Sequence, residues 1–242
     1  MQIVKQSWEF LNEPKGEAIL QLIEVAGRTC YKSEDKITPE SSRTFVKKLI
    51  DSGHHAMIEH GSISVKMVTD RGVTHEIVRH RLASYAQEST RYCNYSKGKF
   101  GGELTIILPV WFYEVVGNRS PEEVYTETFS IFNYGNHEVL SGRSIQYMSW
   151  FGFMRDAETG YLDLINQGQS AQEARSVLPN SLKTEIVMTA NPREWRHFFT
   201  LRCSPAAHPQ MRALALDMLQ GFKATIPVLF DDIYPEVKNG NN

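Results

Sequence analysis

The densest group of side chains that could bind a ligand or take part in catalysis lies where two arginines flank a histidine. Arg79, His80 and Arg81 are followed by Ser89 and Arg91. The planar guanidinium group of arginine can bind phosphate through two parallel hydrogen bonds, and a serine hydroxyl adds a short donor. A solvated run of charges is the alternative, but apolar neighbours on both sides favour a position close to the core, where an unpaired charge is costly. The segment therefore indicates a site for a phosphate-bearing ligand.

A second group of such residues lies on a helix predicted over residues 192–203. The spacing of a single helix face connects three aromatic residues and one arginine: Trp195, Phe198, Phe199 and Arg202. Arg202 therefore extends an apolar stripe, and its guanidinium needs a carboxylate, a carbonyl or a bound ligand as partner. A structural ion pair and a ligand site explain this arginine equally well.

Other basic residues of the same regions also need a partner, which could be a protein group, solvent or a ligand. Arg193 and His197 lie one turn apart on the opposite side of the same predicted helix, where a solvent-facing histidine is the alternative. Arg175 comes just before the apolar segment that ends at Pro179.

The histidines between Gly53 and His60 suggest a metal site, but their spacing argues against one. Helical zinc ligands lie four residues apart, whereas His55 and His60, like His75 and His80, lie five apart. Residues five apart diverge by roughly 140° around a helix. Gly53 also predicts that this stretch is a loop. We therefore predict no metal, and we expect the loop to contact a ligand or to hold a structural histidine.

The composition of the 242-residue chain limits the class of protein. Its 26 basic and 28 acidic residues give a net charge of −2, which argues against proteins that coat nucleic acid or anionic membranes. The longest apolar runs, residues 105–112 and 226–230, are far shorter than the roughly 20 residues that span a bilayer. The start of the chain resembles no signal peptide, and Cys30, Cys93 and Cys203 are few and widely spaced, as in a reducing compartment. We expect a soluble, cytoplasmic protein with no nucleic-acid or membrane partner.

Long helices that alternate with a few short strands are predicted to position these residues, which indicates an α+β fold. Thr38 is expected to cap a helix that has Pro39 at its first position and ends at Gly53. No linker or repeat interrupts the chain, which predicts a single domain over residues 1–242. The predicted strands cover residues 2–11, 62–68, 105–108 and 182–190. The predicted helices cover residues 17–28, 39–52, 72–82, 121 onward, the 150s to 167, 171–178, 192–203 and 211–221.

Four ordered blocks of the sequence resemble the flavin-dependent thymidylate synthases. The arginine–histidine–arginine triplet, followed by seven residues and Ser89, reproduces the R-H-R-x7-S signature of that family. The other three blocks are Gly53-His54 with Glu59-His60, Arg175 with Val177-Leu178-Pro179, and Asn191 with Arg193, His197 and Arg202. The resemblance covers residues 54–91 and 175–215, whereas residues 93–170 resemble the family only loosely, as a variable helical segment.

The resemblance implies a fold, an activity and a set of ligands. The fold would have helices packed on a small, mostly antiparallel sheet, in a homotetramer with sites shared between subunits. The activity would be the reductive methylation of dUMP to dTMP. FAD would be tightly bound, 5,10-methylenetetrahydrofolate would donate the carbon, and NADPH would be the reductant.

The resemblance also implies roles for individual residues, with Arg202 as the catalytic residue that stabilises negative charge on the uracil. Gln87 would contact FAD from a neighbouring chain as well as dUMP. The FAD-binding residues would be His54, Ala56, Arg79, His80, Arg81, Gln87, Asn191, Pro192, Arg193 and His197. The dUMP-binding residues would be Glu76, Ile77, Val78, Arg79, Gln87, Glu88, Ser89, Thr90, Arg91, Arg175 and Arg202.

Two residues depart from the family pattern. Ala56 stands where many relatives carry a hydroxyl residue, so a contact with FAD there must use the backbone. Glu76 stands where relatives often have glutamine, and its carboxylate would repel a phosphate unless Arg79 or a water molecule intervenes. No cysteine lies where a uracil-attacking nucleophile would be expected, and all three are interpreted as small, mostly buried thiols. Ser89 is assigned to binding because no paired histidine and aspartate would activate it.

Two other classes of function compete with a synthase. A non-catalytic nucleotide- or flavin-binding protein would retain the basic pocket and bind ligand without turnover. A metal-dependent hydrolase would use residues 54–60 and would contain bound metal. Neither alternative explains all four blocks of sequence together.

Overall fold

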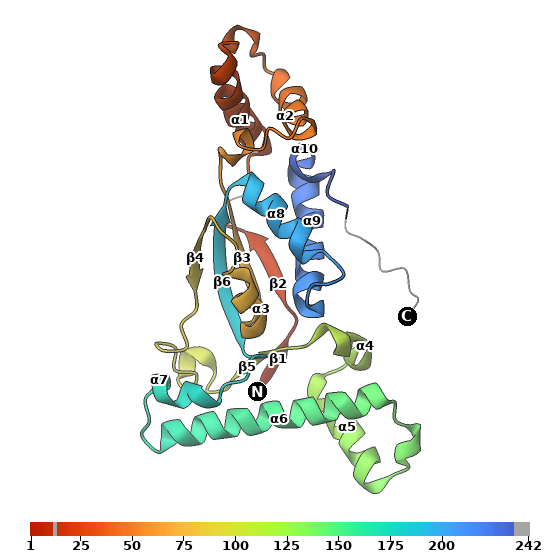
Figure 1. Cartoon of the computed structure of the whole chain (residues 1–242). Helices are drawn as coiled ribbons and strands as arrows, with labels where there is room; N and C mark the ends of the chain where they lie inside the picture. The colour runs from red at the N-terminus through yellow and green to blue at the C-terminus, as the bar shows by residue number, and fades with distance from the viewer. Residues whose placement is uncertain (12–13, 235–242) are drawn as a thin grey trace. The chain divides into compact units, whose positions relative to one another are not determined.

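The computed structural model describes residues 1–11 and 14–234 and has the predicted α+β fold (Figure 1). Its contacts divide the chain into two compact units. The boundary between the units passes within strands and within one helix. The organisation as a single domain over residues 1–242 stays a prediction. Unit 1 holds residues 1–6, 68–74 and 87–185, and unit 2 holds residues 7–67, 75–86 and 186 onward.

The strands are β1 (Gln2–Val4), β2 (Ser7–Phe10), β3 (Ile63–Asp70), β4 (Ala83–Gln87), β5 (Thr105–Ile107) and β6 (Lys183–Ala190). The α-helices are α1 (Gly16–Tyr31), α2 (Ser41–Asp51), α3 (Arg71–Ile77), α4 (Tyr113–Val116), α5 (Pro121–Tyr134), α6 (Gly142–Asn166), α7 (Ala171–Ala174), α8 (Pro192–Arg202), α9 (Pro209–Thr225) and α10 (Pro227–Phe230). Short 3-10 helices cover Glu34–Lys36, Met57–Glu59, Gly98–Phe100, Val110–Phe112, His137–Val139 and Arg175–Val177.

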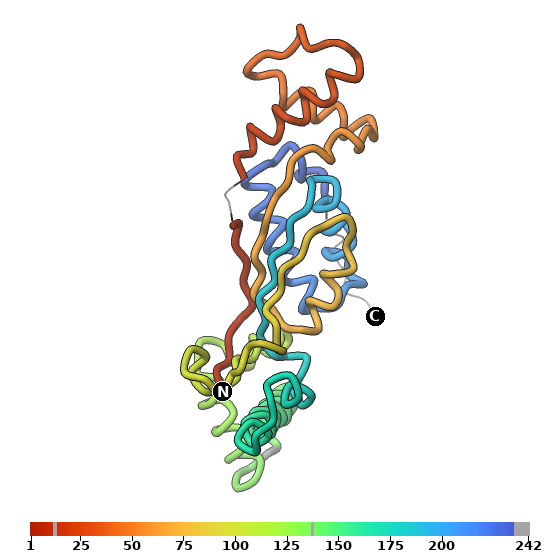
Figure 2. The backbone as a smooth tube through the Cα atoms, turned by 90° about the vertical axis from the view of Figure 1, so that its left-hand side faces the viewer, coloured from red at the N-terminus to blue at the C-terminus, as the bar shows by residue number. Residues whose placement is uncertain are grey.

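Four strands form one sheet in the order β2-β3-β6-β4, and they can be followed as neighbouring tubes in Figure 2. β3 and β6 alternate buried and half-buried residues along their whole length, which is the period of a strand with one covered face. The Ser64 and Thr189 hydroxyls hydrogen-bond at 2.7 Å, and the Arg71 N–H donates to the Leu182 carbonyl, so β3 and β6 run antiparallel. β1 and β5 pair separately and in parallel.

Unit 1 has its core along α6, which packs against α5. Tyr147 and Phe151 of α6 are fully buried in one apolar cluster with Phe112. Farther along the same helix, Met154 and Tyr161 belong to a second cluster, on the strand side of the unit. The helix therefore buries one continuous face, and it accounts for most of the core of the variable segment 93–170.

Unit 2 has an aromatic core between α8, α9 and α10. Trp195, Phe198 and Phe199 of α8 are completely buried, as the predicted apolar stripe requires. Their rings pack against Phe222 of α9 and Phe230 of α10, with the centroids of Phe199 and Phe222 4.9 Å apart. α8 and α9 lie next to each other in Figure 1. This packing fixes α8, and with it the direction in which its polar residues point.

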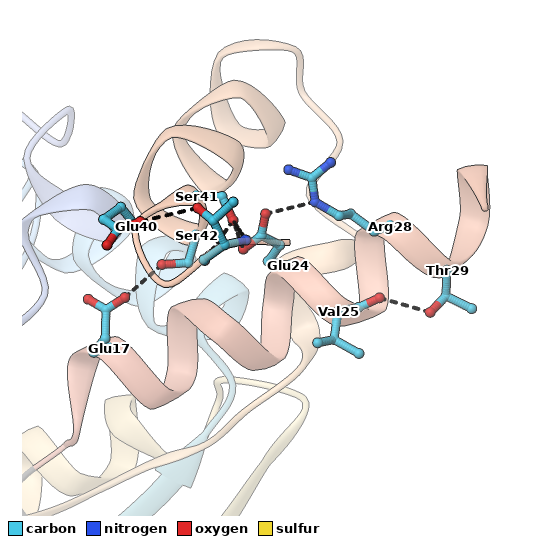
Figure 3. Close-up of polar contacts among 9 residues, drawn as sticks. Glu17, Glu24, Val25, Arg28, Thr29, Glu40, Ser41 and Ser42 are labelled. Atoms are coloured by element: carbon cyan, nitrogen blue, oxygen red, sulfur yellow. Dashed lines mark hydrogen bonds and ion pairs between the residues drawn. The ribbon is translucent and has the colours of Figure 1, made fainter. Parts of the chain in front are cut away.

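A network of polar side chains joins α1 to α2 in unit 2 (Figure 3). The carboxylate of Glu24 is only 1% exposed, and it accepts hydrogen bonds from Arg28 Nε at 2.7 Å and Ser41 Oγ at 2.8 Å. Nearby, Ser42 donates to Glu17 at 2.7 Å. Each partner lies on the same pair of helices, so this buried charge is satisfied locally.

The predicted N-terminal cap of α2 is wrong. The helix begins at Ser41 rather than at Pro39, and Thr38 belongs to the preceding turn. In that turn the Thr38 N–H donates to Ser41 Oγ at 2.9 Å, and the Ser41 N–H donates to the Thr38 carbonyl at 3.2 Å. These reciprocal bonds make a turn where the cap was expected.

The predicted helix over residues 72–82 is too long. α3 ends at Ile77, and residues 78–82 form a turn that leads into β4. The Tyr85 hydroxyl lies 3.0 Å from the Ile77 carbonyl and 2.7 Å from the His80 carbonyl, to which it donates. A side chain from β4 thus takes up carbonyl groups that a longer helix would have bonded internally.

Further expectations differ from the structure. The predicted strand over residues 2–11 divides into β1 and β2, which belong to different sheets. α6 begins at Gly142, well before the predicted start in the 150s, because the Ser141 hydroxyl accepts a backbone N–H of its first turn at 3.0 Å. Cys203 is buried as expected, but Cys93 is half-buried and Cys30 is exposed. Within residues 1–11 and 14–234, no helix has both the length and the apolar character needed to cross a bilayer.

Candidate functional site

The turn after α3 buries the middle one of its three basic residues and exposes the other two. His80 is 3% exposed, whereas Arg79 and Arg81 are exposed. The Tyr85 hydroxyl holds the backbone of this turn through the His80 carbonyl. Burial raises the pKa of Tyr85 to about 12, so the phenol keeps the proton that it donates at neutral pH.

The imidazole of His80 lies between a carboxylate and a guanidinium. Its Nδ1 is 3.2 Å from Oε1 of Glu194, and its Nε2 is 3.0 Å from Nε of Arg202. Because arginine can only donate, Nε2 must accept, and the ring proton then sits on Nδ1 and is donated to Glu194. Burial, followed by the positive charge of Arg202, lowers the pKa of His80 to about 4, so the ring is neutral near pH 7.

The guanidinium of Arg202 has an acceptor at each of its three nitrogen atoms. Besides the bond to His80, Nη1 donates to the Glu76 carboxylate at 2.5 Å and Nη2 donates to the Glu76 carbonyl at 2.9 Å. The arginine side chain is only 14% exposed. The expectation that an arginine on this apolar face needs partners is confirmed. The same contacts explain Glu76, whose carboxylate is neutralised by Arg202 and therefore does not stand as an unpaired charge.

A cavity of about 540 Å³ lies at the start of α8 in unit 2. The side chain of Asn191 caps this helix by accepting the Glu194 N–H at 2.8 Å, which fixes the first turn. Four residues that the sequence predicts as FAD ligands line the cavity, namely Arg81, Asn191, Arg193 and His197. The lining also includes His55, Glu59, Leu82, Glu194, Arg196 and Thr200, which the prediction did not include.

The cavity is lined by three arginines, two of which are already paired. Arg193 pairs with Glu59 at 2.5 Å, and Arg196 forms a two-pronged pair with Asp232. The guanidinium of Arg81 has no carboxylate partner among the described side chains. The cavity therefore presents a cation that can bind an anionic group without first breaking an ion pair.

The other predicted ligands of unit 2 do not line this cavity, although all of them are described residues. The side chains of Ile77 and Pro192 are buried in the core, so only their backbone groups are available to a ligand. The exposed or partly exposed residues of this set are His54, Ala56, Glu76, Val78, Arg79 and Arg202.

The predicted segment 87–91 belongs to unit 1, where its first residues are anchored by the protein itself. Glu88 accepts hydrogen bonds on both carboxylate oxygens, from the Tyr95 hydroxyl at 2.9 Å and from Lys183 Nζ at 3.1 Å. Gln87 donates to the Thr74 hydroxyl at 2.9 Å. Glu88 therefore holds the segment to β6, and its oxygens are engaged before any ligand arrives.

The following residues bring two arginines to the same part of unit 1. Arg175 donates to the hydroxyl of the buried Thr90 at 3.4 Å, and Arg91 donates to Gln172 of α7 at 3.0 Å. The Ser89 hydroxyl accepts the Arg91 N–H at 3.3 Å. The structure thus gathers Ser89, Thr90, Arg91 and Arg175 in unit 1, apart in sequence and unit from Glu76 and Arg202.

Three potential metal ligands also lie together in unit 2. Within the part of the chain that the structure describes, the one such group consists of His80, Glu194 and His197, whose ligand atoms are within 4.8 Å of one another. Both ring nitrogens of His80 already bond to Glu194 and Arg202, and a guanidinium at 3.0 Å opposes a bound cation. This donor set does not fit a metal ion, and the loop at residues 54–60 contributes no ligand to it.

Glu194 is a residue of the candidate site that the sequence does not single out. From sequence it is only the third residue of a capped helix, yet it is 8% exposed and bonded to the imidazole of His80. A usable signal exists, because Glu194, Phe198 and Arg202 follow one another at intervals of four and share one buried side of α8.

Comparison with protein families gives a match to most of the chain. A family model described as "Thymidylate synthase complementing protein" matches residues 16–228. A flavin-dependent thymidylate synthase of Mycobacterium sp. (strain KMS) is 32% identical over 228 residues, which cover 92% of this chain and 84% of that protein. The enzyme of the same name from Geobacter sulfurreducens is 31% identical over 234 residues, covering 94% of this chain and 86% of that protein.

A solved structure has a similar fold. The UMP/dUMP methylase PolB from Streptomyces cacaoi, bound to 5-Br UMP, superposes with a TM-score of 0.68 and covers 96% of this chain and 95% of its own. The two sequences are 20% identical over this match, so the likeness concerns the fold.

Proposed function

This chain belongs to the flavin-dependent thymidylate synthase family, and from that premise we propose that it converts dUMP to dTMP by reductive methylation. In this proposal 5,10-methylenetetrahydrofolate donates the carbon and NADPH supplies the reducing equivalents. The flavin, when bound, supplies the redox chemistry, whereas the protein supplies orientation and charge. A non-catalytic nucleotide-binding protein is the outcome to be excluded by experiment.

The observation that carries the proposal is the immobilised guanidinium of Arg202. Three acceptors hold it in one orientation on a largely buried helix face. A cation held in advance in a region of low dielectric constant stabilises negative charge most effectively where that charge develops. In the proposed reaction this charge develops on the uracil as its N3 proton is lost, and the electron-rich ring then attacks the methylene carbon.

For the FAD, we propose the cavity at the start of α8. Arg81 offers an unpaired guanidinium suited to a pyrophosphate, and Asn191, Arg193 and His197 line the same space. The other FAD contacts that the resemblance implies, at His54, Ala56, Arg79 and Pro192, stay part of the proposal. His80 has no free ring nitrogen, so any contact it makes with FAD uses its ring face or its backbone.

For dUMP, we propose that the phosphate binds the two exposed arginines of unit 1. Arg91 and Arg175 are held by single hydrogen bonds to neutral partners, so their remaining donors are available to an anion. Ser89 and Thr90 add hydroxyl groups to the same set. The dUMP contact at Arg202 and the FAD contact of Gln87 from a neighbouring chain, which the resemblance implies, also stay part of the proposal.

We also propose the homotetramer and the cytoplasmic location that the family resemblance and the cysteine content imply. Large apolar side chains of α5 and α6 support an assembly, because Phe129, Phe132, Tyr134 and Phe153 are 40–84% exposed. Several large apolar side chains exposed on two packed helices are what a face covered by another chain would present.

The experiment that tests the proposed function is a visible absorption spectrum of the purified protein, followed through anaerobic addition of NADPH and then dUMP. We expect a flavin band that bleaches with NADPH at a rate that dUMP alters. When the folate is added, dTMP should form. Protein that contains no flavin and does not take up added FAD would overturn the synthase, and flavin without dTMP formation would favour the nucleotide-binding alternative.

A further inference from the structure

We infer that Glu194 is a positioning residue for Arg202 and acts through the imidazole of His80. This inference rests on the proposed function, because Arg202 is the residue that touches the reacting uracil in that proposal. Glu194 itself would touch neither the uracil nor the atoms that react. Its role is to fix which nitrogen of His80 accepts the hydrogen bond from the guanidinium.

The hydrogen bonds run in one direction from the guanidinium to the carboxylate. Arg202 Nε donates to Nε2 of His80, and Nδ1 of His80 donates to Glu194. A neutral imidazole carries a proton on one nitrogen only, and the partner of the other nitrogen selects which one. A carboxylate can only accept, so it pins the proton to Nδ1 and leaves Nε2 open to Arg202.

Loss of the carboxylate would remove this choice. The proton could then move to Nε2, where its N–H would face the N–H of Arg202, and two donors would point at each other. The guanidinium would keep its bonds to Glu76 but lose the acceptor at Nε. Its plane would no longer be fixed at both edges, so its orientation toward a substrate would vary.

Glu194 is itself held firmly enough to act in this way. Its backbone N–H is capped by the Asn191 side chain at 2.8 Å, and its carboxylate accepts the backbone N–H of Arg81. It is 8% exposed, so water competes little for its oxygens. The carboxylate is thus attached to both segments that it joins, the first turn of α8 and the turn that carries His80.

The first test compares Glu194→Leu with Glu194→Gln in the flavin-loaded protein. Leucine has a similar volume and no acceptor, so we expect kcat to fall about tenfold, the factor that corresponds to loss of one hydrogen bond. Glutamine keeps one carbonyl oxygen and should give an intermediate kcat. The KM for dUMP should change little, because the change affects orientation during the reaction rather than binding of dUMP. Since Glu194 lines the cavity proposed for FAD, kcat is measured per bound flavin.

A matched control separates positioning from stability. Glu24→Leu also removes a buried carboxylate from unit 2 and leaves the residues of the site intact. It should lower the melting temperature without lowering kcat. A Glu194→Leu protein that retains wild-type kcat, or that loses no more of it than Glu24→Leu does, would overturn the inference.

A second test does not depend on turnover. NMR of protein labelled with isotopic nitrogen in its histidine side chains reports which ring nitrogen carries the proton, and His80→Gln identifies the resonances of His80. We expect a protonated Nδ1 and a bare Nε2 in the wild type, and a mixture or reversal in Glu194→Leu. The same tautomer in both proteins would contradict the inference, even if the wild type failed to make dTMP and the proposed function fell on its own.

Discussion

Two buried carboxylates of unit 2, those of Glu24 and Glu194, belong to different hydrogen-bond networks. The comparison separates a role in stability from a role in function. Glu24 accepts bonds from Arg28 and Ser41, and these partners belong to the same helix pair (Figure 3). The guanidinium of Arg28 also lies 4.6 Å from the ring centroid of Phe45. The two charged groups of this network, Glu24 and Arg28, find their partners inside α1 and α2, and nothing in it points to a ligand.

The network of Glu194 ends differently. It passes through His80 to Arg202, and the last partner of that arginine is Glu76, whose side chain is 31% exposed. The chain of bonds thus leads from a buried carboxylate to a group near the surface. Burial of a charge alone does not indicate function. What distinguishes this network is that it ends at Arg202 and Glu76, two of the predicted dUMP-binding residues.

The largest expected difference between the two networks is at their arginines. Arg202→Ala should lower the rate of dTMP formation by roughly 10²–10³-fold, the effect of removing one group that stabilises developing charge. Flavin should stay bound. Arg28→Ala should lower the melting temperature and leave kcat of the folded protein unchanged. Steady-state assays of both variants test the contrast, and undiminished turnover in Arg202→Ala would end the role assigned to that guanidinium.

A pH dependence of stability is expected from the Glu194 network, through His80. The pKa of His80 falls from 6.5 in the unfolded chain to about 4 in the folded protein, so the unfolded chain binds more protons between these values. The free energy of unfolding should therefore decrease as the pH falls from 6.5 to 4, by at most about 3 kcal/mol. Urea unfolding of the wild type and of His80→Gln at several pH values measures the difference. Equal pH slopes in the two proteins would contradict this assignment.

A smaller effect is expected at the hydroxyl that holds the turn of His80. Tyr85→Phe removes its hydrogen bonds to the His80 and Ile77 carbonyls, and we expect kcat to fall several-fold with a loss of about 1 kcal/mol in stability. The matched variant is Tyr147→Phe, which removes a 2.7 Å bond to the Pro121 carbonyl in unit 1. That variant should lose similar stability and no activity, so equal kcat values in the two variants would refute the role of Tyr85.

The smallest effect should come from the network of Glu24. Ser41→Ala removes one of the two donors to Glu24, and it should lower the free energy of unfolding by about 1 kcal/mol. The activity should not change, because no residue of the site contacts this pair of helices through Ser41. Thermal unfolding and a steady-state assay measure both quantities. A loss of turnover in Ser41→Ala would contradict the claim that the Glu24 network affects stability alone.

The sequence predicts helix α8 and the need of Arg202 for partners because both follow from local spacing. Three aromatic residues on one face must be buried, and an arginine on the same face then needs an acceptor, whatever the rest of the fold is. The end of α3 cannot be predicted in this way, since it depends on the Tyr85 hydroxyl of a later strand. The assignment of Glu88 to dUMP stays a prediction. Its contacts with Tyr95 and Lys183 could not be predicted, because these partners meet it only in the folded chain.

The hydrogen bonds that run from Arg202 through His80 to Glu194 limit which substitutions related proteins can accept. His80 serves two neighbours with opposite demands, an acceptor on one side and a donor on the other, so neither neighbour can change its type alone. A viable lineage would have to exchange Glu194 and His80 in the same step or pass through an impaired intermediate. Positions 80, 194 and 202 should therefore be constrained together among related sequences, whereas Ser41 and Arg28 can change independently.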